Sequence, residues 1–323
     1  MTVKNQKTFK LPSFYESSIF ILYLCIGFIP NLDAIDKIAP QWLFMGFLNI
    51  IVGIFIIKNR KSFDESISSH LKSWTTLIYI FFILWSGISF FYAINPTEVL
   101  VNISRQFNVF FMYTNMAVLL TAIDNKSKFF SWVFTVILGF EIYFIFYQVF
   151  EMINISGLIN SGNLKGVTAN RNIAAFSIAL KIPFVLYLVT VGKTSKLKIF
   201  GILITTLAIT SVLIIQSRAS YLAILLIILM YLFVPFLFFK NRNTTKKLKM
   251  LLLVFIPLVL SVSINQLFFA SKGADAVSRA STISFSTNDG SVNQRLRYYK
   301  HVLMHLKSNP LFGVGLGNWK FKF

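Results

Sequence analysis

The sequence is poor in the residues that most soluble enzymes use for chemistry. Its 323 residues include one cysteine, three histidines and eleven acidic residues. The single cysteine, Cys25, excludes an intrachain disulfide and a thiolate metal site. So few carboxylates leave little scope for a paired general acid and base. Charged residues make up only 13% of the chain, about half the share of an average soluble domain.

The chain has long apolar runs instead. Hydrophobic residues make up 56% of it, and its mean hydropathy is +0.70. Runs approaching the ~20 residues that cross a bilayer as a helix recur along the whole length, more than one buried core would need. We therefore predict an all-α, polytopic transmembrane bundle of about nine spans. The expected spans are 14–29, 40–57, 74–92, 107–123, 129–150, 173–191, 199–215, 221–239 and 250–269.

The formal net charge of +20 has a definite distribution. Lysines and arginines cluster before the first run and in every second loop after it, beginning with Lys4, Lys7 and Lys10. Basic loops face the cytoplasm, so the N-terminus is predicted to be cytoplasmic and the chain from residue 270 to lie outside. We thus expect a transmembrane domain, 1–269, and an external segment, 270–323. Charge placed in loops between spans argues against nucleic-acid binding.

The external segment has two expected parts. Residues 270–290 are rich in Ser, Thr, Gly and Asp, which favour turns over helix. Residues 292–307 follow with Leu296, Tyr299 and Leu303 at helical spacing, too polar to cross a membrane, and Asn309-Pro310 ends this helix. We expect a surface or re-entrant helix.

Two motifs in this segment resemble known sites only in part. His301 and His305 have the i, i+4 spacing of a metal pair, but no acidic residue or cysteine nearby supplies further ligands. Gly313, Gly315 and Gly317 recur as in a nucleotide loop, yet without a preceding strand or a following helix. We predict no metal and no cofactor, and a tight glycine turn with exposed backbone N–H groups.

Arginines and one lysine are the most informative polar residues. Arg171, Arg218, Arg295 and Arg297 fall at predicted outer span ends or on the external helix, where a guanidinium suits a phosphate. A lipid pyrophosphate is the anion expected there, the alternative being headgroup binding at the interface. Lys181 lies mid-span before Pro183, and it either has a function, extends to the interface or pairs with Glu141.

Three stretches resemble one known family. Residues 166–175, with Asn170-Arg171-Asn172, open a central span. Gln216-Ser217-Arg218-Ala219-Ser220 forms a turn between two spans. Arg295 and Tyr299 precede a stop that runs from Asn309-Pro310 to Gly313, Gly315, Gly317 and Asn318-Trp319. Together they resemble the O-antigen ligase and O-antigen polymerase superfamily of bacterial membrane glycosyltransferases.

The resemblance implies an enzyme of the bacterial inner membrane. It would move a glycan from undecaprenyl diphosphate to the lipid A-core acceptor at the periplasmic face, among membrane lipids and without a cofactor. Arg218, Arg295 and Arg171 would bind the pyrophosphate, and Asn170, Asn172, Gly313, Gly315 and Gly317 would shape the loops. The family's catalytic histidine would lie beyond Phe323, so the resemblance implies a C-terminally incomplete chain with its general base outside it.

Three alternatives share these residues. The first is an O-antigen or exopolysaccharide polymerase, which differs in its acceptor. The second is a transporter of lipid-linked glycans, in which Lys181 and the arginines would serve passage. The third is an inactive, truncated form.

Overall fold

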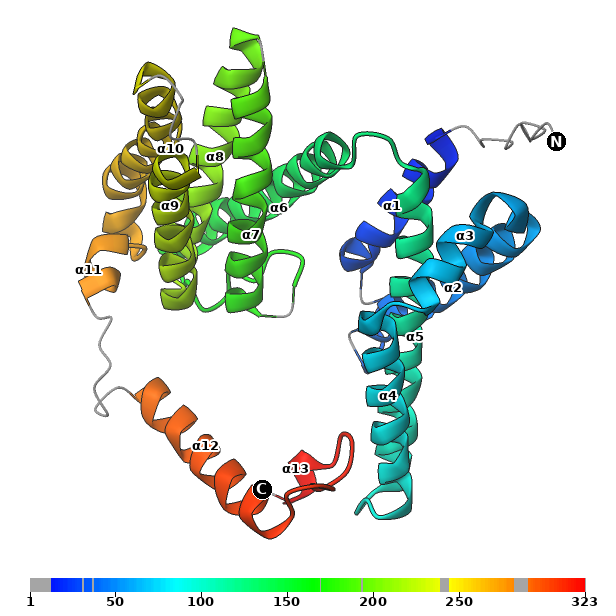
Figure 1. Ribbon diagram of the computed structural model, residues 1–323. Coiled ribbons are helices and arrows are strands. Elements are labelled where there is room, and N and C mark those ends of the chain that lie inside the picture. Colours follow the sequence, from blue (N-terminus) through cyan, green and yellow to red (C-terminus); the bar gives the residue numbers. More distant parts are fainter. Residues whose placement is uncertain are drawn as a thin grey trace, which may run out of the picture. The chain divides into compact units, whose positions relative to one another are not determined.

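The computed structural model describes residues 13–30, 32–36, 38–168, 170–192, 194–238, 244–281 and 290–322. Every regular element in these ranges is a helix (Figure 1). The predicted all-α, polytopic class is therefore confirmed. The chain forms two compact units, Met1–Asp124 with Phe285–Phe323 as unit 1 and Asn125–Ser284 as unit 2.

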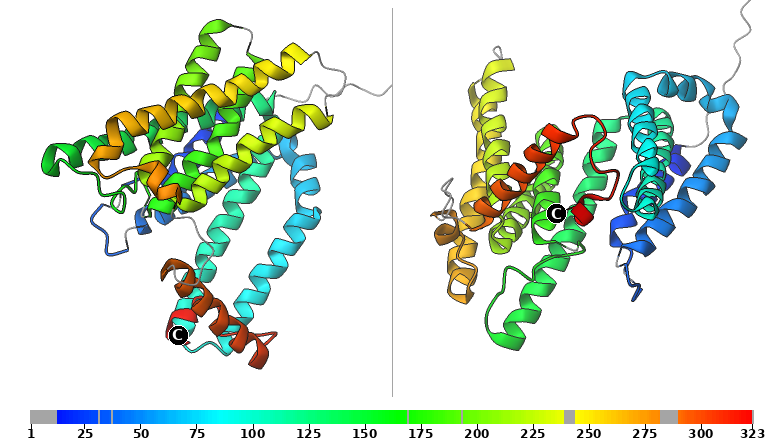
Figure 2. Two further views of the ribbon diagram at one scale, coloured as in Figure 1. Left: turned by 90° about the vertical axis from the view of Figure 1, so that its left-hand side faces the viewer. Right: turned by 90° about the horizontal axis from the view of Figure 1, so that it is seen from below.

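Unit 1 is built around its longest helix, α5 (Pro96–Ala122), which packs against α1 (Ser13–Leu24), α2 (Ala39–Lys58), α3 (Arg60–Leu71) and α4 (Trp74–Ile88). The remaining elements are η1 (Ile26–Phe28), η2 (Ser89–Phe91), α12 (Gly290–Ser308) and α13 (Trp319–Lys322). The C-terminal segment lies at the end of the α4–α5 hairpin (Figure 2). The core includes the buried side chains of Val52, Val118 and Leu119.

Buried polar side chains also hold unit 1 together. Asn115 on α5 donates to the hydroxyl of Tyr23 on α1 at 2.9 Å, and that hydroxyl donates to Asn49 on α2 at 2.8 Å. Asn49 in turn donates to the side chain of Asn108 at 2.6 Å. A buried amide is costly unless its hydrogen bonds are satisfied, so this chain of contacts fixes the register of three helices.

Unit 2 is built around α7 (Arg171–Val191), which packs against α6 (Lys126–Ser156), α8 (Ser195–Ile215) and α9 (Arg218–Phe238). α10 (Thr244–Ile264) packs on α8, and the short elements η3 (Asn265–Phe269), η4 (Ala270–Lys272) and α11 (Ala276–Ser281) follow it (Figure 1). Ile178, Val212 and Ile215 lie in its core. Gly201 of α8 faces Val189 of α7, where an added Cβ would overlap the valine side chain, so the glycine lets the two helices approach closely.

The number of spans differs from the prediction. Six helices in the described ranges are long and apolar enough to cross a membrane: α2, α4 with η2, α6, α7, α8 and the 22 residues from Leu251 to Lys272. The predicted spans 14–29, 107–123 and 221–239 correspond to α1, α5 and α9, which do not reach that standard. α1 has only 12 residues in the described range, the part of α9 whose side chains are continuously described ends at Tyr231 and is too short, and α5 is long enough but not apolar enough.

Two loop predictions also change. The loop expected after residue 57 contains α3, and the turns expected over 270–290 include helix α11. Residues 282–289, Lys4, Lys7 and Lys10 lie outside the described residues. The helix predicted at 292–307 is confirmed as α12, which ends before Asn309-Pro310, and its external location stays a prediction. The division of the chain at residue 269 was predicted from membrane location and stays a prediction.

Candidate functional site

Two of the predicted arginines begin helices at the same end of unit 2. Arg171 is the first residue of α7, and Arg218 is the first residue of α9. The α6–α7 loop and the α8–α9 turn, which precede these arginines, lie at this end as well, because both bind the segment from Lys272 to Asp275. We call it the arginine end of unit 2.

The start of α7 is held by its own loop. Asn170 is the N-cap, and its side-chain oxygen accepts a hydrogen bond of 2.8 Å from the backbone N–H of Asn172, the second helical residue. Thr168 donates from its hydroxyl to the carbonyl of Asn170 at 2.8 Å. The guanidinium of Arg171 donates back to the hydroxyl of Ser161 at 3.3 Å. The loop thus fixes both the helix start and the arginine side chain.

The side-chain amide of Gln148 on α6 also binds this loop. Gln148 accepts a hydrogen bond from the backbone N–H of Gly166 at 3.0 Å and donates to the carbonyl of Gly166 at 3.3 Å. Gly166 has a φ of +55°, and an added Cβ would lie 3.2 Å from Ile145. Glycine suits this position because it adopts a positive φ without strain and has no Cβ to approach Ile145.

The α8–α9 turn presents Arg218. Gln216 has a φ of +56°, which ends α8 and turns the chain, and Ser217 and Ser220 are buried behind the turn. The side chain of Gln216 donates to the carbonyl of Asp275 at 3.1 Å, and its own carbonyl accepts from Arg279 at 3.4 Å. A third guanidinium, that of Arg279, therefore lies beside the turn that precedes Arg218.

Sequence reasoning did not single out Arg279. It lies on α11, which begins after Asp275: the carboxylate of Asp275 accepts from the backbone N–H groups of Val277 at 2.9 Å and Ser278 at 3.2 Å. The hydrogen bond from Gln266, together with these N–H groups, lowers the pKa of Asp275 below its ordinary value. A signal was present in the sequence, since Asp is one of the residues that commonly cap the start of a helix.

The segment that carries α11 is fastened by a buried asparagine. Asn265 donates to the carbonyl of Ala274 at 3.0 Å and accepts from the backbone N–H of Ala276 at 3.0 Å. The α6–α7 loop joins it, because the backbone N–H of Ile159 donates to the carbonyl of Lys272 at 2.7 Å. The loops of the arginine end thus form one hydrogen-bonded layer.

The electrostatics of this layer favour an anion. The N-terminus of a helix carries a positive partial charge, where an acidic residue is usual and a cation is unfavourable. Both α7 and α9 begin with arginine, and neither has an acidic residue in its first turn. Arg171 and Arg218 therefore add charge to a potential that is already positive, an arrangement that binding of a phosphate group stabilises.

The remaining predicted site residues lie in unit 1. Arg295 is exposed on α12. The ring of His305, near the end of α12, lies edge-on to the ring of Trp319 with a centroid distance of 6.3 Å. Gly313, Gly315 and Gly317 all have positive φ, as expected of a tight turn. The backbone N–H groups of that turn were expected to be exposed, and this was wrong for Leu316, whose N–H donates to the hydroxyl of Ser89 at 3.0 Å. In the described ranges, no group of three His, Cys, Asp or Glu side chains is placed to hold a metal.

Comparison with known proteins finds a family match for the C-terminal part of the chain. Residues 203–323, which include Arg218, Arg279 and Arg295, match the sequence profile of a family described as O-Antigen ligase. No curated protein and no solved structure matches the chain. The superfamily predicted from the three motif stretches is therefore confirmed, and with it a membrane glycosyltransferase of ligase or polymerase type. Over residues 203–323, the chain is thus similar to the O-antigen ligase family.

Proposed function

We propose that the protein is an O-antigen ligase that transfers a glycan from undecaprenyl diphosphate to the lipid A-core acceptor at the periplasmic face of the bacterial inner membrane. The observation that carries this proposal is the pair of arginines that begin α7 and α9 at one end of unit 2. Their helix N-termini and guanidinium groups suit the diphosphate of a lipid carrier.

In the proposed reaction, a hydroxyl oxygen of the acceptor attacks the anomeric carbon of the glycan. The bond from that carbon to the diphosphate breaks, undecaprenyl diphosphate leaves with the electron pair, and the hydroxyl proton passes to a general base. Negative charge grows on the diphosphate as the bond breaks. Arg171 and Arg218 stabilise this charge more in the transition state than in the ground state, which accelerates the transfer.

Substitution of Arg218 tests the proposal. In the protein expressed from its own gene, we expect Arg218→Ala to lower the attachment of O-antigen about 100-fold, the usual effect of removing one stabilising group from a transition state. Arg60→Ala is the matched control, because Arg60 is an exposed arginine on α3 whose ion pair with Asp64 is solvated. Lipopolysaccharide gels measure attachment, and immunoblots of membranes measure the amount of protein. Unchanged attachment in Arg218→Ala would contradict the proposal.

A deletion strain separates ligase from polymerase. Loss of a ligase leaves long glycan on the carrier lipid, whereas loss of a polymerase leaves acceptors capped with a single repeat unit. We expect the carrier-linked polymer to accumulate. Accumulation of single-repeat products would assign the same arginines to a polymerase.

A further inference from the structure

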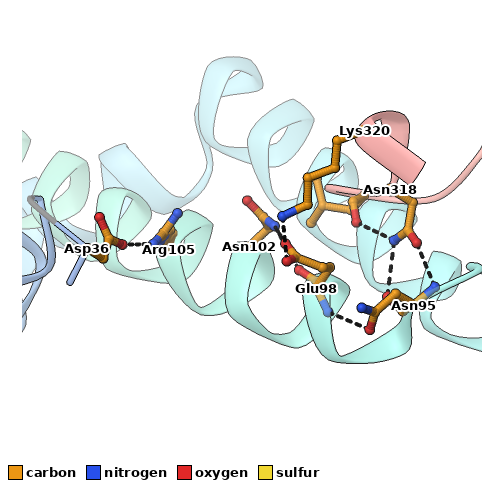
Figure 3. Close-up of polar contacts among 8 residues, drawn as sticks. Asp36, Asn95, Glu98, Asn102, Arg105, Asn318 and Lys320 are labelled. Carbon is orange, nitrogen blue, oxygen red and sulfur yellow. Dashed lines mark hydrogen bonds and ion pairs between the residues drawn. The ribbon is translucent and has the colours of Figure 1, made fainter. Parts of the chain in front are cut away.

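The glycine-rich turn packs against the chain 220 residues before it. Residues 312–320, which we call the docking strap, lie on the α4–α5 corner, residues 85–102 (Figure 3). The hydroxyl of Tyr92 donates to the carbonyl of Phe312 at 2.7 Å, and the ring of Phe312 stacks on Trp85 with a centroid distance of 5.7 Å.

Asn318 makes the central contact. Its side-chain oxygen accepts from the backbone N–H of Asn95 at 2.6 Å, and its side-chain nitrogen donates to the carbonyl of Asn95 at 3.1 Å and to that of Leu316 at 2.9 Å (Figure 3). The side chain thus pairs with the backbone of Asn95 as a neighbouring strand would. Asn318 is fully buried, so loss of these bonds would leave polar groups without water to replace them.

The glycines of the strap make this approach possible. An added Cβ on Gly315 would lie 2.7 Å from the Cβ of Ala93, and one on Gly317 would overlap the side chain of Asn102. At the edge of the strap, the ammonium of Lys320 lies 2.6 Å from the carboxylate of Glu98, the first acidic residue of α5. The glycines, the amide of Asn318 and the charge of Lys320 are therefore all complementary to the α4–α5 corner.

The strap is also joined to α12. Trp319 contacts the ring of His305 on α12, and the backbone N–H of Gly313 donates to the carbonyl of Asn309, the residue after α12, at 3.3 Å. A strap fixed at Asn95 therefore fixes the C-terminal end of the helix that carries Arg295.

We propose that Asn318 is a positioning residue, which clamps the docking strap to Asn95 and so holds α12 and Arg295 in place for glycan transfer. The inference rests on the proposed function only for the statement that Arg295 is held in place for glycan transfer. Docking of the strap is a property of unit 1 alone.

Thiol labelling measures docking without reference to activity. Ser89 is 2% exposed, and Leu316 and Gly315 lie over it. In a Cys25→Ser background, which removes the single native thiol, Ser89→Cys is the reporter, and N-ethylmaleimide is the probe. We expect slow labelling in the parent and a rise of at least about tenfold with Asn318→Asp, which keeps the acceptor but removes both donors and places a carboxylate against two carbonyls. Asn309→Asp, an exposed asparagine before the strap, is the control and should label slowly.

Transfer activity tests positioning. We expect Asn318→Asp and Lys320→Glu to lower O-antigen attachment at unchanged protein level, and Glu98→Lys to restore it in the Lys320→Glu background. Such rescue by a charge swap depends on the contact between the two residues rather than on either side chain alone.

Each negative outcome has one meaning. Fast labelling of Ser89→Cys in the parent, or slow labelling in Asn318→Asp, overturns the clamp. Fast labelling of Ser89→Cys in Asn318→Asp together with unchanged O-antigen attachment shows that docking does not position Arg295. That outcome leaves the proposed function intact. Unchanged attachment in Arg218→Ala overturns the proposed function and leaves the docking result standing.

Discussion

The ammonium group of Lys181 on α7 lies 3.0 Å from each carboxylate oxygen of Glu141 on α6. Ser177, one turn before Lys181, completes the group: its hydroxyl accepts from Lys181 at 2.6 Å and donates to Glu141 at 2.8 Å. Pairing with Glu141 was one of the explanations that the sequence offered for a lysine in the middle of a span, and it is confirmed. The pair ties α7, which begins with Arg171, to α6.

Removing one partner of this pair should be more damaging than removing both. Glu141→Gln leaves a buried ammonium without a counter-charge, which we expect to cost about 3–5 kcal/mol of folding free energy. Glu141→Leu combined with Lys181→Met replaces both charges by apolar groups and should recover most of that loss. Thermal unfolding in detergent micelles measures the difference. A single variant as stable as the parent would mean that the two charges are solvated in the folded protein.

Alanine variants of Gly313 and Gly315 provide a controlled test of how closely the docking strap must approach Ala93. Both have positive φ, so alanine at either position costs about 1–2 kcal/mol of backbone strain. Only at Gly315 would the new Cβ also collide with Ala93, because nothing lies within 4 Å of the position at Gly313. We therefore expect Gly315→Ala to expose the Ser89→Cys reporter much more than Gly313→Ala does. Equal labelling of the two variants would show that close approach at Ala93 is not required.

Acid should weaken the segment that carries Arg279. The hydrogen bond from Gln266 and the N–H groups of α11 hold the pKa of Asp275 below its ordinary value of 3.8. A carboxyl group with a lowered pKa stabilises the fold at a pH above its unfolded pKa, and this contribution is lost as the pH falls through the folded pKa. We expect Asp275→Asn to lower the unfolding temperature at neutral pH, with the difference from the parent shrinking as the pH falls below 3.8 and lost below the lowered pKa of the folded state. A difference that persists undiminished in acid would assign the effect to side-chain size rather than charge.

Local patterns in the sequence predicted much of this structure. Apolar run length located the long helices, and Arg171 and Arg218 were recognised because each directly precedes an apolar run. Arg279 was missed because Ser, Thr, Gly and Asp around it favour turns. α11 forms where Asp275 caps it and Gln216, 59 residues earlier, holds it.

Contacts between distant residues account for what the sequence did not predict. The Asn318–Asn95 pairing joins residues 223 positions apart, and no periodic pattern marks either partner. Gln148, Asn265 and Asn318 share one role, since each binds a backbone N–H and a backbone carbonyl of a loop. Gln148 and Asn265 lie in apolar runs, but so do Asn49 and Asn115, which bind other helices, so the sequence alone does not identify the partner of such an amide.

The proposed orientation places the arginine end of unit 2 in the periplasm, and α7 offers a direct test because the loops at its two ends contain exposed lysines. Lys165 lies in the loop before α7, and Lys196 lies at the start of α8, after it. In the Cys25→Ser background, a membrane-impermeant maleimide applied to intact spheroplasts should label Lys165→Cys at once. Lys196→Cys should be labelled only after permeabilisation, because basic loops stay in the cytoplasm. The reverse pattern would put Arg171 and Arg218 on the cytoplasmic side, away from a periplasmic acceptor, and would exclude the proposed ligase reaction while leaving the fold unchanged.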